Sequence, residues 1–450
     1  MELDYFKSTG FRIKELKIST KDGKTEDITQ LYEEINIFDS IFQPCLNGNI
    51  LIKDSSGLIH NLLLDGNEFL LLNIGKTNDD ELSIKRIFRI YKLTNRKMVN
   101  LNSETYILNF VSEEYIQSTV TRVCQSFGDK TLSEIALFIL RDYMKAPDSK
   151  IKDGIFDSSL GIKKIVFPTV SPIKAITEVA KLAIDEKGTP GFLFFENLFG
   201  YNFASLRNLL EKKSVFDINF NPKNLNVSEE VSDFLGVRHF EVLQQFDLLD
   251  NIEKGVYGGK YKAFDPQTHD YVEMLFTYDS INHPRSPENS APSVGNIRTY
   301  DGSVMNSHFD ASFIKGTTNL LADFDESIKN NDEDSSQKRI DYENIVFQRK
   351  AIFSLFSSQR VKLVVPGNFL LCSGNNVFLH VPKFSQKTPG EDNWDRTLYG
   401  SYMIVSSRHM IKPNGIHETI FEACTNSSNR SENNVMYDRN NYLNEDYNVA

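Results

Sequence analysis

The stretch from Glu33 to Asp54 reads EEINIFDSIFQPCLNGNILIKD and decides the fold. The pair Phe38-Asp39 precedes a turn, and Gly48 then opens a run that reaches Asp54 after five intervening residues. Between them the residues alternate with a β-branched bias, and the next three residues are typical of a turn. This pattern predicts a β-strand, a turn and a second β-strand.

The segment 239–265, HFEVLQQFDLLDNIEKGVYGGKYKAFD, repeats the same short motifs in the same order. Phe246-Asp247 again precedes a glycine, five residues and an aspartate, here Gly259 and Asp265. We therefore expect the two segments to occupy the same strand in two copies of one β-unit.

Two later strand-like runs close each copy at matching spacing. Phe88 is followed after sixteen residues by Glu104-Thr105, and Tyr402 is followed after sixteen residues by Glu418-Thr419. We expect these hairpins to correspond, with Phe88–Phe110 matching Tyr402–Cys424. A chain that builds one β-unit twice favours an architectural role over catalysis.

Composition narrows the class of protein. At 450 residues the chain is long enough for about three domains. The net charge of −11 disfavours wrapping nucleic acid, which needs clustered Lys and Arg, but suits a surface that nucleic acid slides past. The four cysteines lie far apart with no Cys-x-x-Cys pair, which argues against a zinc knuckle or a disulfide framework (Cys45, Cys124, Cys372, Cys424).

No stretch of the chain is suited to membranes. The N-terminus, MELDYFKSTG, is charged from its second residue, and the longest apolar runs fall far short of the roughly 20 residues that a bilayer requires. We expect a protein made in the cytosol, without membrane insertion.

Changes in periodicity divide the chain. Between the two β-units, a capping box at Thr131–Glu134, a helix beginning at Ser171-Pro172 and a hairpin turning near Asn197–Gly200 indicate an α/β module. Residues 322–344 carry eight acidic and three basic residues, and we expect them to be the least ordered internal segment. The predicted divisions are a first barrel (1–115), an inserted α/β module (116–236), a second barrel (237–280 and 345–425), an insertion with the acidic segment (281–344) and an Asn-rich arm or tail (426–450).

A search for catalytic and binding motifs finds none. Gly75-Lys76-Thr77 imitates the end of a phosphate loop, but the motif needs glycine where Leu70 stands. His409 and His417 are the closest histidine pair, expected in adjoining strands, and no acidic ligand stands at metal spacing.

Carboxylate pairs also lack a catalytic signature. Glu33-Glu34 and Glu113-Glu114 would face opposite ways on a strand, as solvated edges. A glycosidase pair that converges only in space stays open, because sequence spacing does not reveal it. The sequence predicts a non-enzyme with no catalytic, cofactor-binding or metal-binding residues and no cofactor.

Five segments, in chain order, carry a family resemblance. They are 33–58, 191–210, 361–382, 399–410 and 417–423, and the sharpest motif is Val-Pro-Gly-Asn at 365–368 followed by Gly374 and a valine strand. In these segments, over about residues 30–425, the chain resembles the central baseplate hub proteins of contractile-tail bacteriophages, which are related to the base of type VI secretion spikes.

The resemblance implies a mainly β fold with α+β insertions, in which two similar tube β-barrels accompany an inserted α/β module. It implies a homotrimer whose six barrels form a ring, joining a six-fold tail tube protein above to a three-fold central spike protein below. Other baseplate proteins would surround the ring, and DNA would pass its channel without specific binding. The protein would reside in the virion tail baseplate after assembly in the host cytoplasm.

Two other classes remain open. One is a tail-associated cell-wall hydrolase, and the other is a receptor-binding or carbohydrate-binding tail module. The repeat argues against the second, because adhesins usually place recognition on one compact domain at a chain end.

Overall fold

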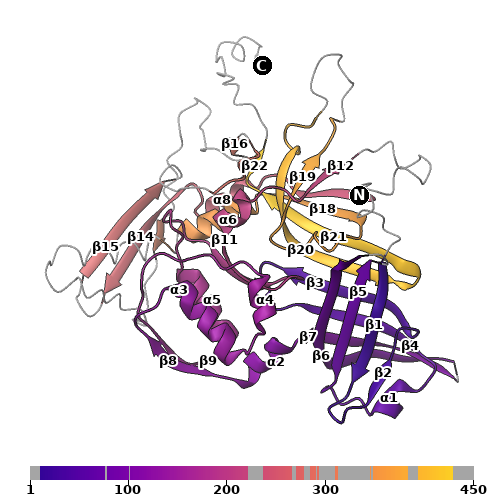
Figure 1. Cartoon of the computed structure of the whole chain (residues 1–450). Coiled ribbons are helices and arrows are strands. Elements are labelled where there is room, and N and C mark those ends of the chain that lie inside the picture. Colours follow the sequence, from indigo (N-terminus) through magenta and orange to yellow (C-terminus); the bar gives the residue numbers. More distant parts are fainter. Residues whose placement is uncertain are drawn as a thin grey trace, which may run out of the picture.

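One large antiparallel sheet organises the molecule (Figure 1). The structure, a computed structural model, describes residues 11–76, 79–100, 102–220, 237–265, 270–277, 284–289, 291–292, 310–312, 345, 348–383 and 394–428. The strands of the large sheet follow the order β13-β18-β21-β20-β3-β4-β7-β6-β5-β1-β2. In addition, β19 pairs with β20, and β12 pairs with β19. The mainly β class predicted from the sequence is confirmed.

The first part of the chain builds one half of this sheet. Its strands and single helix are β1 (Phe11–Ser19), β2 (Thr25–Asp27), β3 (Tyr32–Ser40), β4 (Asn47–Asp54), α1 (Leu58–Leu62), β5 (Phe69–Lys76), β6 (Asp79–Asn100) and β7 (Ser103–Ser112). Alternation in β7 buries Tyr106, Leu108 and Phe110, and burial contributes about 1.5–3 kcal/mol for each such side chain. The turn after β4 is held by Asp54, whose carboxylate accepts backbone N–H groups of Ser56, Gly57 and Leu58 and whose pKa is consequently lowered despite burial.

The second half of the sheet comes from the C-terminal part of the chain. Its strands are β12 (Phe216–Asn219), β13 (His239–Gln244), β18 (Gln359–Pro366), β19 (Asn376–His380), β20 (Gly400–Lys412) and β21 (Ile416–Thr425), and a 3-10 turn (Pro413–Gly415) joins the last two. The alternating valines and leucines of β18 and β19 are buried in one apolar core, as the period of two of a strand requires.

The two halves repeat one strand arrangement. We call β3 to β7 repeat A, and β13 together with β18 to β21 repeat B. In chain order β13, β18, β19, β20 and β21 correspond to β3, β4, β5, β6 and β7, and the sheet orders β13-β18-β21-β20 and β3-β4-β7-β6 match. The fifth strand also matches, because β19 pairs antiparallel with β20 as β5 pairs with β6.

Residue registers agree between the repeats. Asp54 of β4 lies opposite Glu104 of β7, and Pro366 of β18 lies opposite Glu418 of β21. Glu104 and Glu418 thus lie opposite the last residue of β4 and of β18, as the predicted match requires, and the β6–β7 and β20–β21 hairpins occupy the same place in the two strand orders. Each of these hairpins also carries a bulge at nearly the same place, between Ile90 and Lys92 in one and between Ile404 and Ser406 in the other.

The structure corrects two other parts of the predicted repeat. Gly259–Asp265 lies in β14 (Gly258–Asp265), which pairs with β15 (Asp270–Thr277) and β17 (Asp310–Ser312) in a separate small sheet. The counterpart of β4 is β18, which follows about a hundred residues later. The Gly-to-Asp spacing misled the prediction because strand partners are chosen by long-range pairing and not by local turn chemistry.

The second correction concerns the barrels. The pairings of the described strands join both repeats in one sheet through β20 and β3, and no pairing among them closes a barrel. The resemblance implies two separate barrels in each chain. A single sheet shared by both repeats contradicts that expectation.

The inserted module packs beside repeat A, at the lower left of Figure 1. Its elements are α2 (Glu113–Val120), β8 (Val123–Phe127), α3 (Leu132–Phe138), a π-helix (Ile139–Tyr143), α4 (Asp148–Lys152), β9 (Ile165–Val170), α5 (Pro172–Leu182), β10 (Phe192–Glu196), β11 (Tyr201–Ser205) and α6 (Leu206–Glu211). The predicted capping box is present, since Thr131 accepts the backbone N–H of Glu134 while the Glu134 carboxylate accepts that of Thr131. The predicted hairpin is β10–β11, and α5 begins at Pro172.

Smaller elements complete the described chain. They are α8 (Leu248–Glu253), β16 (Ala291–Pro292) paired with β22 (Ser427–Ser428), and a helix over 348–356. Within the predicted C-terminal arm, Asn426 is buried and donates to the carbonyl oxygen of Pro284. The acidic segment 322–344 lies outside the described residues, as do residues 429–450.

Candidate functional sites: the repeat junction and a buried polar network

The first candidate site is the junction where repeat B meets repeat A. Residues 406–411 of β20 pair antiparallel with residues 35–40 of β3, and Met410 lies opposite Asn36. The fourth strand of repeat B in chain order, β20, is thereby bonded to the first strand of repeat A, β3, so that the repeats follow one another head to tail along the sheet.

Polar side chains fix the register of this junction. Arg408 donates from Nε to Oδ1 of Asn36 at 2.8 Å and from Nη2 to Glu34 at 3.2 Å, and Lys412 lies 3.8 Å from the same carboxylate. The guanidinium also lies 5.8 Å from the centre of the Phe38 ring. Half-exposed ion pairs of this kind stabilise by up to about 1 kcal/mol each, so their main effect is to select one alignment of the strands.

A buried polar cluster lies across the same junction. The Ser407 hydroxyl donates to Asp39 of β3, and the same hydroxyl lies 3.2 Å from Nε2 of His409. His409 Nδ1 lies 3.2 Å from the Thr419 hydroxyl and 3.3 Å from Nε2 of His417. Every member of the cluster is buried, so the cluster holds three strands together and is closed to a substrate.

Burial sets the charge of this cluster. It raises the pKa of Asp39 to about 7, against the opposing effect of the Ser407 hydrogen bond. It lowers the pKa of His409 to about 3, and that of His417 well below its usual value, so both rings are neutral at pH 7. The described residues contain no group of three His, Cys, Asp or Glu side chains that could hold a metal ion.

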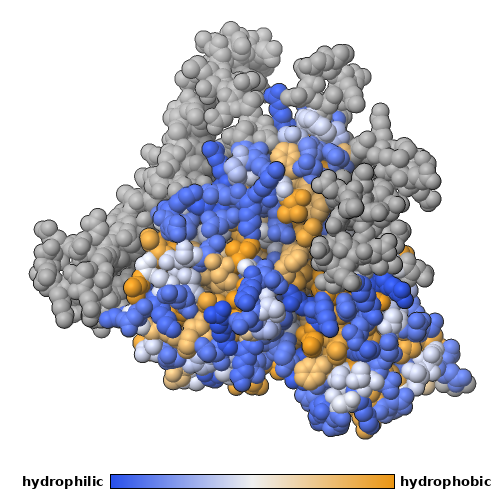
Figure 2. Space-filling view, in the orientation of Figure 1, coloured by the Kyte–Doolittle hydropathy of each residue, from blue (hydrophilic) through white to orange (hydrophobic). Residues whose placement is uncertain are grey.

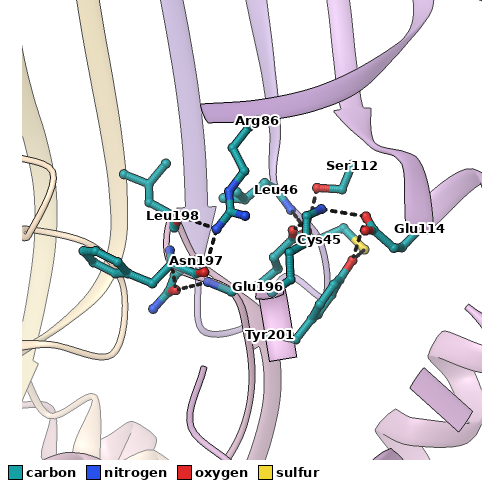
Figure 3. A network of polar contacts seen from close by, with 12 residues as sticks. Cys45, Leu46, Arg86, Ser112, Glu114, Glu196, Asn197, Leu198 and Tyr201 are labelled. Carbon is teal, nitrogen blue, oxygen red and sulfur yellow. Dashed lines mark hydrogen bonds and ion pairs between the residues drawn. The ribbon is translucent and has the colours of Figure 1, made fainter. Parts of the chain in front are cut away.

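The second candidate site is a polar network between repeat A and the inserted module (Figure 3). At its centre Lys150 of α4 lies 2.8 Å from the carboxylate of Glu114 on α2 and 3.1 Å from that of Glu196 on β10. Glu196 also accepts the backbone N–H of Leu46 at 3.0 Å and the hydroxyl of Ser112 at 2.6 Å. Glu196 thus joins the module to the β3–β4 turn and to the end of β7, while Lys150 holds Glu196 and Glu114 together.

The network is withdrawn from solvent. Burial raises the pKa of Glu114, although Lys150 beside it acts in the opposite direction. Burial by itself lowers the pKa of Lys150, but Glu196 and Glu114 outweigh that effect and raise it. Tyr201 and Cys45 complete the network, with the phenol oxygen 3.4 Å from Glu114 and 3.7 Å from the thiol sulfur.

A second set of contacts anchors the tip of the β10–β11 hairpin. Arg86 of β6 donates to the carbonyl oxygens of Leu198 and Phe199, both at 2.6 Å. Asn197 reaches repeat B, where its amide donates to the carbonyl oxygen of Ser373 at 3.1 Å. The hairpin therefore contacts both repeats.

The residues considered in the sequence are spread over the sheet. Gly75 and Lys76 lie inside β5, in a ladder with β1, and so form no phosphate loop, while Thr77 lies outside the described residues. The pair Glu113-Glu114 was wrongly placed on a strand, because it forms the first turn of α2. Glu113 pairs with Arg89, and Glu114 is buried against Lys150.

Sequence reasoning missed the residues that build both sites. The sequence places Asp39 just before a turn, and in the structure its carboxylate accepts from the Ser407 hydroxyl across the repeat junction. Lys150 carried no signal, because it stands in an ordinary charged stretch. Glu196 did carry one, since it is the single charged residue in the apolar run FLFFENLFG, where a charge must find a partner.

Comparison with known proteins gives structural matches alone: no protein-family model and no curated protein sequence matches the chain. Among solved structures, the chain is similar to a tail protein from Neisseria meningitidis MC58, with 9% identity, a TM-score of 0.48, and 92% of this chain and 96% of that chain covered. It is also similar to the 43 kDa tail protein of prophage MuSo2 from Shewanella oneidensis, with 10% identity, a TM-score of 0.49, and 91% and 97% covered.

A third similar structure is the E. coli c3393 protein, a type VI secretion system component described as structurally similar to T4 bacteriophage tail proteins. Its identity is 9% and its TM-score 0.41, over 94% of this chain and 77% of that chain. Across the part of the chain that the structure describes, none of the helices has both the length and the apolar character needed to cross a membrane.

Proposed function

We propose that this chain is the structural hub of a contractile-tail baseplate, as its sequence resemblance implies. Three copies form a ring of six repeats that joins a six-fold tail tube protein to a three-fold central spike protein. Other baseplate proteins surround the ring, and DNA passes its channel without specific binding. The assembly forms in the host cytoplasm and resides in the virion tail.

One observation supports this proposal most strongly, namely that repeats A and B share one strand order and are joined head to tail by β20 and β3. A three-fold object can meet a six-fold tube without mismatch only if each subunit offers two nearly equivalent surfaces. Separate barrels would supply such surfaces, and so do two repeats that follow one another along a single sheet. We therefore propose the symmetry match in a changed form, in which the sheet continues around the ring.

The domain limits given in the sequence analysis belong to this proposal, except that β14 and β15 within 237–280 form part of a separate small sheet. Repeat A forms the first tube unit. Repeat B forms the second tube unit, and its strands come from both sides of the 281–344 insertion. The module 116–236 occurs once per chain, so the proposed ring carries six repeats and three modules.

The mass of the purified complex in solution tests the proposal. We expect three times the chain mass of 51.5 kDa at micromolar concentration in native mass spectrometry. A stable, well-folded monomer under these conditions would contradict the hub. No duplex-specific DNA binding is expected at moderate salt, because the chain carries a net charge of −11.

The proposed role is non-enzymatic. The carboxylates of Glu114 and Glu196 share the Lys150 ammonium, and both side chains are buried, so a glycan has no access to the pair. We expect no muramidase or amidase turnover above background. Turnover by the purified protein that a single carboxylate substitution abolishes would favour the hydrolase instead.

A further inference from the structure

Lys150 differs from the other lysines of the described chain that pair with a carboxylate. Its side chain is 8% exposed, and the side chains of its partners Glu114 and Glu196 are 6% and 0% exposed. In the other lysine–carboxylate pairs among the described residues, both side chains are at least 25% exposed. One primary amine and two carboxylates are thus held together out of water.

The Glu196 carboxylate is oriented to react with the Lys150 amine. Its Oε1 lies 3.1 Å from the lysine Nζ. Its Oε2 accepts the backbone N–H of Leu46 at 3.0 Å and the hydroxyl of Ser112 at 2.6 Å (Figure 3). Two donors on one oxygen stabilise the negative charge that develops there when a nucleophile adds to the carboxyl carbon. Acyl transfer to the lysine requires this arrangement.

Glu114 is placed to act as the base. Its Oε2 lies 2.8 Å from Nζ of Lys150, within reach of a proton that the amine must lose on acylation. Burial raises the pKa of Glu114, so its carboxylate is a stronger proton acceptor than that of an exposed glutamate. The donor pair on Oε2 marks Glu196 as the acylating group, and Glu114 remains to move the proton.

The backbone keeps these groups at short range. A Cβ atom on Gly200 would lie 2.0 Å from the carbonyl oxygen of Lys150, and a Cβ atom on Gly154 would lie 1.7 Å from the carbonyl oxygen of Tyr201. The two glycines therefore let α4 and the chain after it lie directly against the β10–β11 hairpin. Groups held in contact by a fold react as if their concentration were about 10⁵–10⁸ M.

We propose that, after folding, the chain forms an amide bond between Nζ of Lys150 and Cδ of Glu196. One proton passes from the ammonium to Oε1 of Glu196, and the neutral amine then attacks Cδ. Glu114 takes a second proton from the nitrogen and delivers it to Oε1, which leaves as water. The N–C bond forms, the C–Oε1 bond breaks, and no oxidant or other reactant takes part.

The product suits the site that the fold provides. The amide oxygen is Oε2 of Glu196, which keeps its two hydrogen bonds, and the amide N–H can donate to Glu114. One buried cation and one buried anion become a neutral amide, so the cost of keeping both ions from water disappears. The ion pair is the state before reaction, because only the fold brings the groups together. The bond closes a covalent loop from residue 150 to residue 196 within the module and does not depend on the proposed hub.

Intact-mass spectrometry of the purified full-length chain under denaturing conditions tests the bond. We expect the wild type to be one water molecule lighter than its unmodified chain. A protease digest should contain a branched peptide in which Lys150 is joined to Glu196. K150R keeps the positive charge but removes the amine, and it should have the unmodified mass. The matched control K181R changes an exposed lysine that pairs with Glu178, and it should show the same loss of water as the wild type.

Two further variants test the chemistry while Lys150 and Glu196 stay in place. E114Q removes the base, and S112A removes one donor to Oε2. In samples taken over time after synthesis, we expect the bonded fraction to rise at least a hundredfold more slowly in E114Q and at least tenfold more slowly in S112A. Circular dichroism spectra that match the wild type establish that each variant is folded.

The outcomes separate the bond from the proposed function. A wild type that keeps its unmodified mass would overturn the bond, and so would a loss of water that persists in K150R. Wild-type rates in folded E114Q and S112A would overturn the assigned chemistry. A bonded monomer would support the bond and contradict the hub, whereas an unbonded trimer would do the reverse.

Discussion

At the residue scale, Lys150 ties together three elements of the inserted module. From α4 it pairs with two buried carboxylates, Glu114 on α2 and Glu196 on β10. Replacing it with methionine keeps much of the volume but leaves both acids without their cation. Removal of one partner from a buried ion pair costs about 3–5 kcal/mol.

We therefore expect K150M to lower the free energy of unfolding by about 3–5 kcal/mol in urea denaturation. The triple variant K150M/E114Q/E196Q should recover part of this loss, because no unpaired charge remains. K181M removes a half-exposed lysine that pairs with Glu178 and should change the free energy of unfolding by about 0.5 kcal/mol or less. Equal effects of K150M and K181M would show that the network is not structural.

Also at the residue scale, Asp39 gives the stability a defined dependence on pH. Its pKa in the folded protein is about 7, above the ordinary value of 3.8, so between about pH 4 and pH 7 the folded state binds the extra proton. The stability contributed by this group is complete below the unfolded pKa and is lost as pH rises through the folded pKa. The buried His409 acts in the opposite direction, because its lowered pKa removes stability as pH falls below 6.5.

The D39N variant isolates the aspartate from the histidines. We expect the difference in the free energy of unfolding between the wild type and D39N to shrink by about 2 kcal/mol from pH 5 to pH 7. The wild type becomes less stable over this range because Asp39 titrates, whereas the asparagine of the variant has no proton to lose. Urea denaturation of both proteins at each pH measures the difference directly. A cost that is constant over this range would contradict the raised pKa of Asp39.

At the element scale, the turn that ends β18 depends on a close approach of backbone to side chain. A Cβ atom on Gly367 would lie 2.0 Å from Cγ of the buried His417 ring, and the Gly367 N–H donates to the His417 carbonyl oxygen at 2.8 Å. The ring cannot retreat, because it packs against Phe369 and His409. The glycine of the Val-Pro-Gly-Asn motif is therefore required by packing.

We expect G367A to lower the free energy of unfolding by about 1–3 kcal/mol, the usual range for overpacking a well-filled core. The matched control is G128A, where the nearest heavy atom to the added methyl lies 3.8 Å away, on the flexible Lys164 side chain. That variant should stay within about 0.5 kcal/mol of the wild type. The two thermal unfolding curves, measured side by side, decide the point.

The sequence predicted individual helices, strands and turns more successfully than it predicted which strands pair and which side chains meet. The capping box at Thr131, the hairpin at Asn197–Gly200 and the buried alternation of β18 follow from periods and turn chemistry that act over a few residues. Gly259–Asp265 was assigned to the wrong place because a glycine and an aspartate at this spacing mark a strand and a turn without specifying the neighbour. The buried network was missed because its acids and lysine meet only in space.

At the scale of the whole molecule, the chain holds two copies of one strand arrangement but single copies of its other parts. Repeats A and B share their strand order, whereas the α/β module and the small β14–β15–β17 sheet each occur once. In Figure 1 the module and the small sheet lie to one side of the large sheet, and in Figure 2 hydrophobic residues on this face gather in separate patches among hydrophilic ones. A ring of three chains built through the repeats would thus combine two symmetries in one particle.

This arrangement predicts what averaged electron micrographs of the purified complex will show along its axis. The layer formed by the repeats should have a strong six-fold rotational component, because six similar repeats follow one another around the ring. The layer that contains the modules should be three-fold, because only three modules are present. The variant K150M/E114Q/E196Q removes the buried charges but keeps the module, and it should keep the six-fold layer. Averages that are three-fold in every layer would show that the two repeats are not equivalent in the assembly, and the hub would then have to match the tail tube by some other means.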